Sequence, residues 1–337
     1  MLTSVLITAY RRRAFLLGAV DSVLSQTLPR GDYEVVVVKD WADPSVDAEW
    51  ESRGVRLLIE DIPVVGQMLR AGLRQCRGDV VCFLDDDDTF RPSKLEHVRS
   101  AFEADPELVF LRNGFEPVDR AGAPAPAFRR VLPQPRAPFA FRADRATARD
   151  FSRVVKTRAY GNLSTFSVRR ASIAEREDAL VHVEACTDSS VATIMLDAAG
   201  RHRFVPQVWT ARRVGTSLRS LGKGAEARRA IRTLEYLRAQ SRSPVARRYA
   251  DMFLSWARVD AFLNSEDGRL SFPEWLTYVR YHLPRLDADT WETEAWSFGK
   301  RFAPRLVASA YRRRREGWAT ASAPGSPPSE PRATVKP

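Results

Sequence analysis

Four consecutive aspartates, Asp85 to Asp88, are the residues of this sequence with the clearest chemical potential. They follow the apolar run VVCFL at residues 80–84, which is typical of a buried strand. Adjacent carboxylates repel one another, and this raises their pKa values unless a positive charge lies among them. Mg²⁺ or Mn²⁺ supplies such a charge, since hard cations take one or two carboxylates together with substrate phosphates. We therefore expect a divalent-metal site that binds phosphate; the alternative is an acidic surface turn that caps the next helix.

Polar residues also follow two other predicted strands. Asp40 comes after EVVVV at residues 34–38, and Thr8, Ala9 and Tyr10 end the run that begins with SVLIT. Ligands of open α/β sheets bind outside the carboxyl ends of the strands. Each residue alone is also explained as a turn residue or a helix cap. A ligand site is predicted because the residues at these three strand ends are expected to lie together at one crevice.

The elements that must position these side chains alternate between strand and helix over the first hundred residues. Apolar runs predict strands at 4–8, 34–38, 55–59 and 79–84, and one-sided apolar spacing predicts helices at 14–26, 66–76 and from Pro92 onward. Ser93 and Glu96 have the spacing of a capping box. This alternation predicts the α/β class, with a doubly wound, mostly parallel sheet flanked by helices.

The pattern is weaker in the rest of the chain. We expect strands at 108–111, 165–168 and 204–210, helical structure resuming near Ala148, and a helix at 189–199. A stretch rich in proline and arginine, residues 117–143, is predicted to be irregular. Residues 225–315 have helical spacing, and residues 319–337, rich in Pro, Ser and Gly, are predicted to be a disordered tail.

Composition excludes several classes of protein. The chain has 337 residues, of which 44% are hydrophobic, so it can bury a sizeable core and is not wholly disordered. No apolar run approaches the roughly 20 residues of a membrane-spanning helix. The three cysteines have no zinc or disulfide spacing. We expect a cytoplasmic protein. Its net charge of +11 points to a polyanionic partner or to a simply basic surface.

Four segments of the first hundred residues resemble glycosyltransferase family 2, whose members have the GT-A fold. They are SVLITAYRRRAFLLGAVDSVLSQ at 4–26, EVVVVKDWAD at 34–43, residues 66–78, and VVCFLDDDDTFRPSKL at 80–95. The resemblance is specific over about residues 3–115 and weaker from 150 to 217. It implies an inverting transferase that moves a sugar from a nucleoside-diphosphate sugar, preferably a UDP-sugar and otherwise a GDP-sugar. The acceptor it implies is a hydroxyl of a saccharide or a lipid-linked molecule.

The resemblance also implies roles for the residues at the strand ends. Thr8, Ala9 and Tyr10 would touch the nucleotide, and Asp40 would recognise the base. Asp86 would lie near the ribose, and Asp85 would also bind the nucleotide-sugar. Asp87, with Asp88, would bind the Mn²⁺ or Mg²⁺ that bridges the diphosphate. Two motifs depart from the family pattern, Lys39-Asp40-Trp41-Ala42 and Met68-Leu69-Arg70-Ala71-Gly72, so the base and the donor sugar stay open.

The acceptor half is matched by shorter motifs. Residues 161–165 resemble the family's acceptor-side wall, and Asp188 is matched to the aspartate that acts as catalytic base. An inverting transfer needs one carboxylate to accept the proton of the attacking hydroxyl. The alternative for Asp188 is a helix N-cap, and Glu184 and then Asp178 are the competing bases. Arg212 would stabilise the leaving diphosphate, or would belong to a solvated basic turn.

These motifs predict three regions: a GT-A domain at 1–217, a helical region at 218–318 and the tail. Within the first, the nucleotide half is about 1–115 and the acceptor half about 145–217. Residues 298–318 combine an apolar stripe with the four adjacent arginines Arg312–Arg315 and would contact an anionic membrane or pack on the domain. Two alternative functions are considered. One is a sugar nucleotidyltransferase, although this sequence lacks the Gly-rich signature of such enzymes after the first strand. The other is a non-catalytic basic binding module. No nucleic-acid partner is expected.

Overall fold

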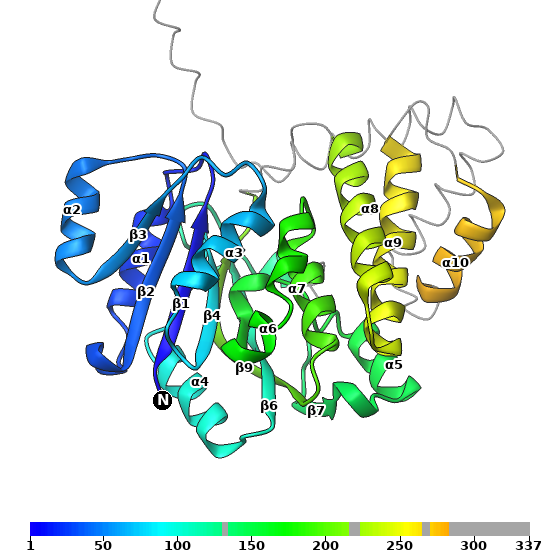
Figure 1. Cartoon of the computed structure of the whole chain (residues 1–337), viewed down its shortest axis with the longest axis horizontal. Helices are drawn as coiled ribbons and strands as arrows, with labels where there is room; N and C mark the ends of the chain where they lie inside the picture. The colour runs from blue at the N-terminus through cyan, green and yellow to red at the C-terminus, as the bar shows by residue number, and fades with distance from the viewer. Residues whose placement is uncertain (130–133, 216–222, 265–269, 283–337) are drawn as a thin grey trace, which may run out of the picture.

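The computed structural model describes residues 1–129, 134–215, 223–264 and 270–282 of the chain. Within these residues one curled sheet runs in the order β3-β2-β1-β4-β8-β6-β9-β5, with β7 paired to β9 (Figure 1). Helices cover both faces of the sheet, and three further helices stand beside its second half (Figure 1). The predicted α/β class is therefore confirmed.

The first half of the sheet is parallel. Strands β1 (Thr3–Ala9), β2 (Tyr33–Lys39), β3 (Val55–Ile59) and β4 (Val80–Asp85) pair in the same direction. Each of them covers a predicted strand. Continuous β-branched runs suit this part of the sheet because helices bury both of its faces.

Alternate side chains of these strands feed two separate cores. Val5 and Ile7 of β1 pack with α1 (Leu16–Leu24), α2 (Pro44–Ser52) and α4 (Lys94–Ala104). Leu6 packs on the opposite face with α3 (Val65–Gln75). A Cβ atom at Gly72 of α3 would lie 2.3 Å from Leu6 Cδ1, so glycine is required there for the helix to approach the sheet. The sequence analysis missed α2, whose apolar stripe is reduced largely to Trp50.

The second half of the sheet is mixed. Strands β6 (Leu108–Val118) and β9 (Arg201–Arg213) are parallel to each other, whereas β8 (Phe166–Arg169) is antiparallel to β4 and β6. Strands β5 (Thr89–Phe90) and β7 (Phe139–Arg142) are antiparallel to β9. The prediction ended β6 too early because the buried polar pair Arg112 and Asn113 interrupts its apolar run. It missed β7, a four-residue strand that lies within the segment predicted to be irregular.

The start of α4 differs from the predicted capping box. Ser93 is the N-cap residue, but its side chain makes no capping hydrogen bond. Instead, Gln26 Oε1 accepts the backbone amide hydrogen of Leu95 over 3.0 Å. The unpaired amide at the helix start is thus satisfied by a residue 69 positions away, which local spacing does not reveal.

The C-terminal helices pack against the part of the chain that lies between β7 and β9. Helices α5 (Ala148–Lys156), α6 (Arg170–Ala174) and α7 (Thr187–Leu196) belong to that part, and α8 (Lys223–Gln240), α9 (Pro244–Asn264) and α10 (Phe272–His282) follow β9. Tyr249 and Met252 of α9 join the core that contains α7. Among the described residues, no helix is long and apolar enough to cross a membrane. The predicted boundary at residue 217, the basic segment 298–318 and the predicted tail lie outside the described residues.

Candidate active site

The carboxyl ends of β1, β2 and β4 meet as predicted. Thr8 lies in register with Val38 of β2 and with Asp85 of β4. The two loops that follow β1 and β2 are joined, because the backbone amide of Arg11 donates to Asp40 Oδ1 over 2.8 Å. One edge of the sheet thus brings together the residues expected at the nucleotide: Thr8, Ala9, Tyr10 and Asp40.

Arg12 pairs with two members of the aspartate run. Its Nε donates to Asp86 Oδ2 over 3.1 Å, and its Nη1 lies 2.8 Å from Asp87 Oδ2. Burial acts to lower the pKa of Arg12, but the hydrogen bond to Asp86 and the charges of the neighbouring aspartates raise it above its ordinary value. Burial, opposed by Arg12, raises the pKa of Asp86 to about 6. The sequence analysis did not single out Arg12, although three adjacent arginines follow Tyr10.

Asp88 faces the interior of the protein. Its side chain is buried, its Oδ1 accepts the backbone amide of Arg213 over 2.8 Å, and its Oδ2 accepts Asn162 Nδ2 over 3.3 Å. Burial and the charge of Asp87 raise the pKa of Asp88 to about 6. Both carboxylate oxygens therefore fasten the aspartate turn to β9 and to the loop before β8. The expected metal-ligand role of Asp88 stays a prediction.

A buried polar layer supports the turn from below. Ser164 Oγ accepts the backbone amide of Asp85 over 3.0 Å, and the Ser164 carbonyl accepts Lys94 Nζ over 2.6 Å. Burial lowers the pKa of Lys94 to about 7. Burial and the negative charges of its three neighbours and of Asp188 raise the pKa of Asp85 well above its ordinary value. The charge of Asp188 is the smallest of these contributions to the raised pKa of Asp85.

The aspartate turn suits a divalent cation with few protein ligands. Among the described residues, no three His, Cys, Asp or Glu side chains group as a complete metal site. Asp86 and Asp87 nevertheless direct oxygens to one guanidinium, so their carboxylates converge on a single cationic position. Mg²⁺ and Mn²⁺ sites that act on phosphates use one or two carboxylates and complete their shell with the substrate and water. The residues present therefore fit such a cation.

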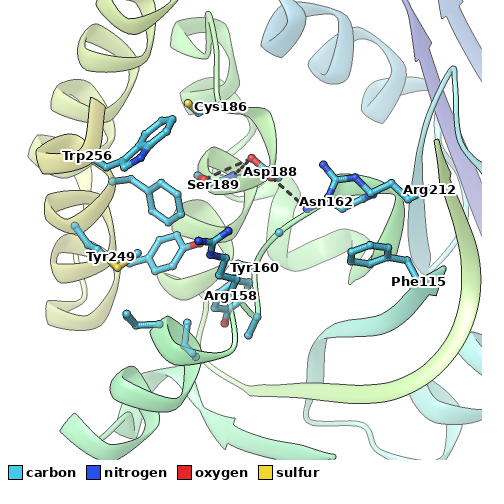
Figure 2. Close-up of a pocket in the computed structure, with 16 residues that line it drawn as sticks. Phe115, Arg158, Tyr160, Asn162, Cys186, Asp188, Ser189, Arg212, Tyr249 and Trp256 are labelled. Atoms are coloured by element: carbon cyan, nitrogen blue, oxygen red, sulfur yellow. Dashed lines mark hydrogen bonds between the residues drawn. The ribbon is translucent and has the colours of Figure 1, made fainter. Parts of the chain in front are cut away.

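A cavity of about 250 Å³ separates the sheet domain from α9. Figure 2 shows Asp188 and Arg212 on one side of it and the aromatic side chains of α9 on the other. The Arg212 guanidinium lies 5.4 Å from the centre of the Phe115 ring. The α9 wall consists of Tyr249, Met252, Phe253 and Trp256. The sequence predicts helical structure over residues 225–315 but does not place these side chains opposite Asp188.

Asp188 is half-buried in the first turn of α7. Its Oδ2 accepts the backbone amide of Asn162 over 3.2 Å, and its Oδ1 accepts the backbone amide of Ser189 over 2.7 Å (Figure 2). The N-cap residue of α7 is Cys186, two positions earlier. The alternative role of Asp188 as N-cap is therefore wrong. Its carboxylate is held at the wall of the cavity by two amides.

The competing carboxylates lie elsewhere. Glu184 accepts a hydrogen bond from Arg232 Nε over 3.0 Å, and this bond lowers the pKa of Glu184. Asp178 pairs with Arg70 over 2.5 Å, and its side chain is 85% exposed. Neither residue lines the cavity. Asp188 is the single acidic residue among the cavity-lining residues that the structure describes.

Backbone strain concentrates at this cavity. Arg158, Asn162 and Cys186 have φ values of 45°, 72° and 54°, in the left-handed region that non-glycine residues avoid, and all three line the cavity. Such a conformation costs about 1–3 kcal/mol per residue and persists where the surrounding structure enforces it, often at functional sites. The cavity is therefore a built feature of the fold.

Known proteins match the first part of this chain. Residues 4–159 match the family model described as glycosyl transferase family 2. An uncharacterized glycosyltransferase of Haemophilus influenzae is 30% identical over 110 residues, which make up 32% of this chain and 37% of that protein. One from Nostoc sp. is 33% identical over 109 residues, 31% of this chain and 33% of its own length. The chain thus spans about a third of the length of these relatives.

Solved structures match over most of the chain. S. aureus TarS 1–349 in complex with UDP has a TM-score of 0.55 and 13% identity, covering 95% of this chain and 92% of its own. The mannosyltransferase PcManGT from Pyrobaculum calidifontis, in complex with GDP-Man and Mn²⁺, has a TM-score of 0.50 and 15% identity, covering 91% and 86%. At such identities the likeness shows the fold alone. Residues 4–159 therefore match glycosyl transferase family 2, and the chain has the GT-A fold.

Proposed function

We propose that this protein is an inverting glycosyltransferase that moves a sugar from a nucleoside-diphosphate sugar to a hydroxyl of a saccharide or lipid-linked acceptor. One observation carries the proposal. Asn162 donates its backbone amide to Asp188 and its side-chain amide to Asp88, so one residue links the candidate base to the aspartate turn beside the cavity. A transferase needs these two features together, since the acceptor hydroxyl must reach the sugar while the diphosphate is held.

The donor end of the site suits a nucleotide. In this proposal Thr8, Ala9 and Tyr10 contact the nucleoside, Asp40 selects the base, and Asp85 and Asp86 lie beside the ribose and the donor sugar. Solved structures with the same fold support a UDP-sugar or a GDP-sugar, since TarS is solved with UDP-GlcNAc and the mannosyltransferase with GDP-Man. We favour a UDP-sugar.

Asp87 would hold the Mg²⁺ or Mn²⁺ ion, with Asp86 beside it. When bound, the ion supplies positive charge to the oxygens of the diphosphate. Asp88 has both oxygens engaged by Arg213 and Asn162, so we assign it the task of fixing the turn. Arg12 pairs with the same carboxylates as the ion would.

Asp188 would act as the general base. The acceptor hydroxyl gives its proton to this carboxylate while its oxygen bonds to the anomeric carbon, and the bond from that carbon to the diphosphate oxygen breaks. The amides of Asn162 and Ser189 orient the carboxylate. Arg212 lines the same cavity and would stabilise the charge that grows on the leaving diphosphate.

A thermal-shift panel of UDP, GDP, CDP and dTDP, each with and without Mn²⁺, tests the proposal. One nucleotide should raise the melting temperature in a way that requires Mn²⁺, and its sugar conjugates should then release the nucleoside diphosphate. If no nucleotide shifts the melting temperature under any condition, the proposed function is contradicted.

Contact with an anionic membrane remains a proposal from the sequence, because residues 298–318 lie outside the described residues. Four adjacent arginines at a membrane surface contribute about 1 kcal/mol each at low salt. Liposome co-sedimentation of the full chain against a truncation after Pro304 tests it. Equal sedimentation of both forms would contradict it.

A further inference from the structure

Arg112 of β6 is a fully buried guanidinium that the fold does not pair. Its relative exposure is 0%, and neither its Nε nor either Nη atom has a hydrogen-bond partner among the described residues. Desolvating an unpaired charge is far more costly than burying a neutral polar group, so buried arginines are normally paired with carboxylates. The folded state by itself gives no reason for a cation at this position.

The surroundings of Arg112 contain a second arginine. The Arg112 guanidinium lies 5.6 Å from the centre of the Phe115 ring, and the Arg212 guanidinium lies 5.4 Å from the same ring. Burial and the charge of Arg212 lower the pKa of Arg112 to about 9. Phe115 and Arg212 line the cavity that holds Asp188, so Arg112 lies directly behind its wall. Among the described residues, no ion pair to a carboxylate is found for either arginine.

We propose that Arg112 and Arg212 together form a subsite for an oxyanion group of a substrate, with Arg112 acting from behind Phe115. The ligand supplies the negative charge that the fold leaves out. The diphosphate of the donor is one source of such a group, and a phosphate or carboxylate on the acceptor is the other. The donor source rests on the proposed function; the acceptor source requires only an anion in this cavity.

Because the protein interior has a low dielectric constant, the charge of Arg112 can act on a ligand that it does not contact. A charge that water does not screen acts over several ångströms. Arg112 therefore adds to the positive electrostatic potential where Arg212 contacts the ligand, without touching the ligand itself. Arg212 would then donate directly to the oxyanion in the manner of guanidinium–phosphate pairs. Arg112 is thus a positioning charge and Arg212 the contacting residue.

Two substitutions at Arg112 separate this role from a structural one. Arg112→Met removes the charge and keeps the length of the side chain, and Arg112→Lys keeps the charge. We expect Arg112→Met to have an equal or higher melting temperature in the absence of ligand, because an unpaired buried charge is removed. The same variant should bind the oxyanion ligand about ten- to a hundredfold more weakly, the range of a charge-assisted interaction. Arg112→Lys should retain most of the affinity.

Arg169→Met is the matched control. Arg169 is another arginine of the sheet with an unpaired nitrogen, but its Nε donates to the Leu108 carbonyl over 3.1 Å and it does not line the cavity. This substitution should leave ligand affinity unchanged.

Isothermal titrations with UDP, uridine and inorganic phosphate identify the source of the oxyanion. A donor diphosphate at the subsite predicts weaker UDP binding by Arg112→Met and equal uridine binding. An acceptor anion predicts unchanged UDP binding, while phosphate binds the UDP-saturated wild type and not the variant.

The inference is overturned if Arg112→Met binds UDP and phosphate like the wild type. It is also overturned if both variants lose stability, since Arg112 would then have a structural partner. A wild type that binds no UDP contradicts the favoured UDP-sugar donor, and the phosphate titration still decides the inference.

Discussion

The backbone amide of Asn162 donates to Asp188 Oδ2 over 3.2 Å, and the side-chain amide of the same residue donates to Asp88 Oδ2 over 3.3 Å. Asn162 makes both bonds from a left-handed backbone conformation with φ 72°. The loop before β8 therefore sets the position of the candidate base relative to the aspartate turn.

Asp188→Asn should reduce turnover by about 10²–10⁴-fold, the usual effect of removing a positioned base. The asparagine oxygen can still accept one of the two amide hydrogens that hold Asp188, so the fold and nucleotide affinity should be retained. Release of nucleoside diphosphate from the donor sugar measures turnover, and calorimetry measures affinity. Glu184→Gln is the matched control and should turn over normally, because Glu184 is engaged by Arg232. Normal turnover by Asp188→Asn would mean that the base lies elsewhere.

Asp87→Asn should weaken Mn²⁺-dependent nucleotide binding by about ten- to a hundredfold, because a charged ligand of the ion is lost. Binding measured without Mn²⁺ should change little. Asp178→Asn, at an exposed carboxylate far from the cavity lining, serves as the control. If affinity and its metal dependence both stay at wild-type values in Asp87→Asn, Asp87 does not hold the ion.

Asp40→Ala should weaken nucleotide binding and narrow the difference between uracil and guanine nucleotides, if Asp40 selects the base. Asp40 also accepts the amide of Arg11, so Asp40→Asn, which keeps an acceptor oxygen, separates loop support from base recognition. Titration of UDP and GDP against each variant gives the comparison. A loss that is equal for both bases would show that Asp40 only supports the loop.

Arg158→Gly should be more stable than Arg158→Ala by about 1 kcal/mol, since only glycine takes a left-handed backbone without steric cost. Arg158 follows the last turn of α5, where its amide bonds the Val155 carbonyl over 3.2 Å and the next amide bonds the Val154 carbonyl over 3.0 Å. This is the hydrogen-bond pattern of a helix end that normally uses glycine. Both variants lose the same side chain, so urea unfolding of the pair isolates the backbone term. Equal free energies of unfolding for Arg158→Gly and Arg158→Ala would contradict backbone strain at Arg158.

Lys94 should make stability rise with pH. Its pKa is lowered to about 7 in the folded protein by burial, whereas an unfolded lysine keeps its proton to about pH 10.4. Between these values the unfolded state binds more protons, so the free energy of unfolding increases with pH by at most about 1.4 kcal/mol per unit. Urea unfolding of the wild type and of Lys94→Met at pH 7, 8 and 9 checks this. The stability of the wild type relative to the variant should grow over that range; a constant difference would mean that Lys94 stays charged.

The strand ends and their aspartates could be predicted from the sequence. β-branched runs and one-sided apolar spacing are local signals, and parallel strands bring their carboxyl ends to one edge wherever they pair. This is why Asp40, Asp85 and Thr8 were expected to converge, and the register of β1 with β2 and β4 confirms it. Asp188 was identified as a candidate base only by the family resemblance, because no local sequence signal distinguishes a catalytic base from a helix N-cap.

The partners of these residues depended on the tertiary structure. The pairing of Arg12 with Asp86 and Asp87 joins residues 74 and 75 positions apart, and Gln26 replaces the Ser93 side chain at the start of α4 across a similar separation. The aromatic wall of α9 has the same helical spacing as any core stripe, and only its docking opposite Asp188 makes it part of a cavity. Buried Arg112 breaks the apolar pattern of β6, so its environment could not be inferred locally. The periodic spacing of residues predicts which of them share a face of one helix or strand. Charge pairs and cavities form between different elements, and no periodic pattern in the sequence links residues that lie far apart in the chain.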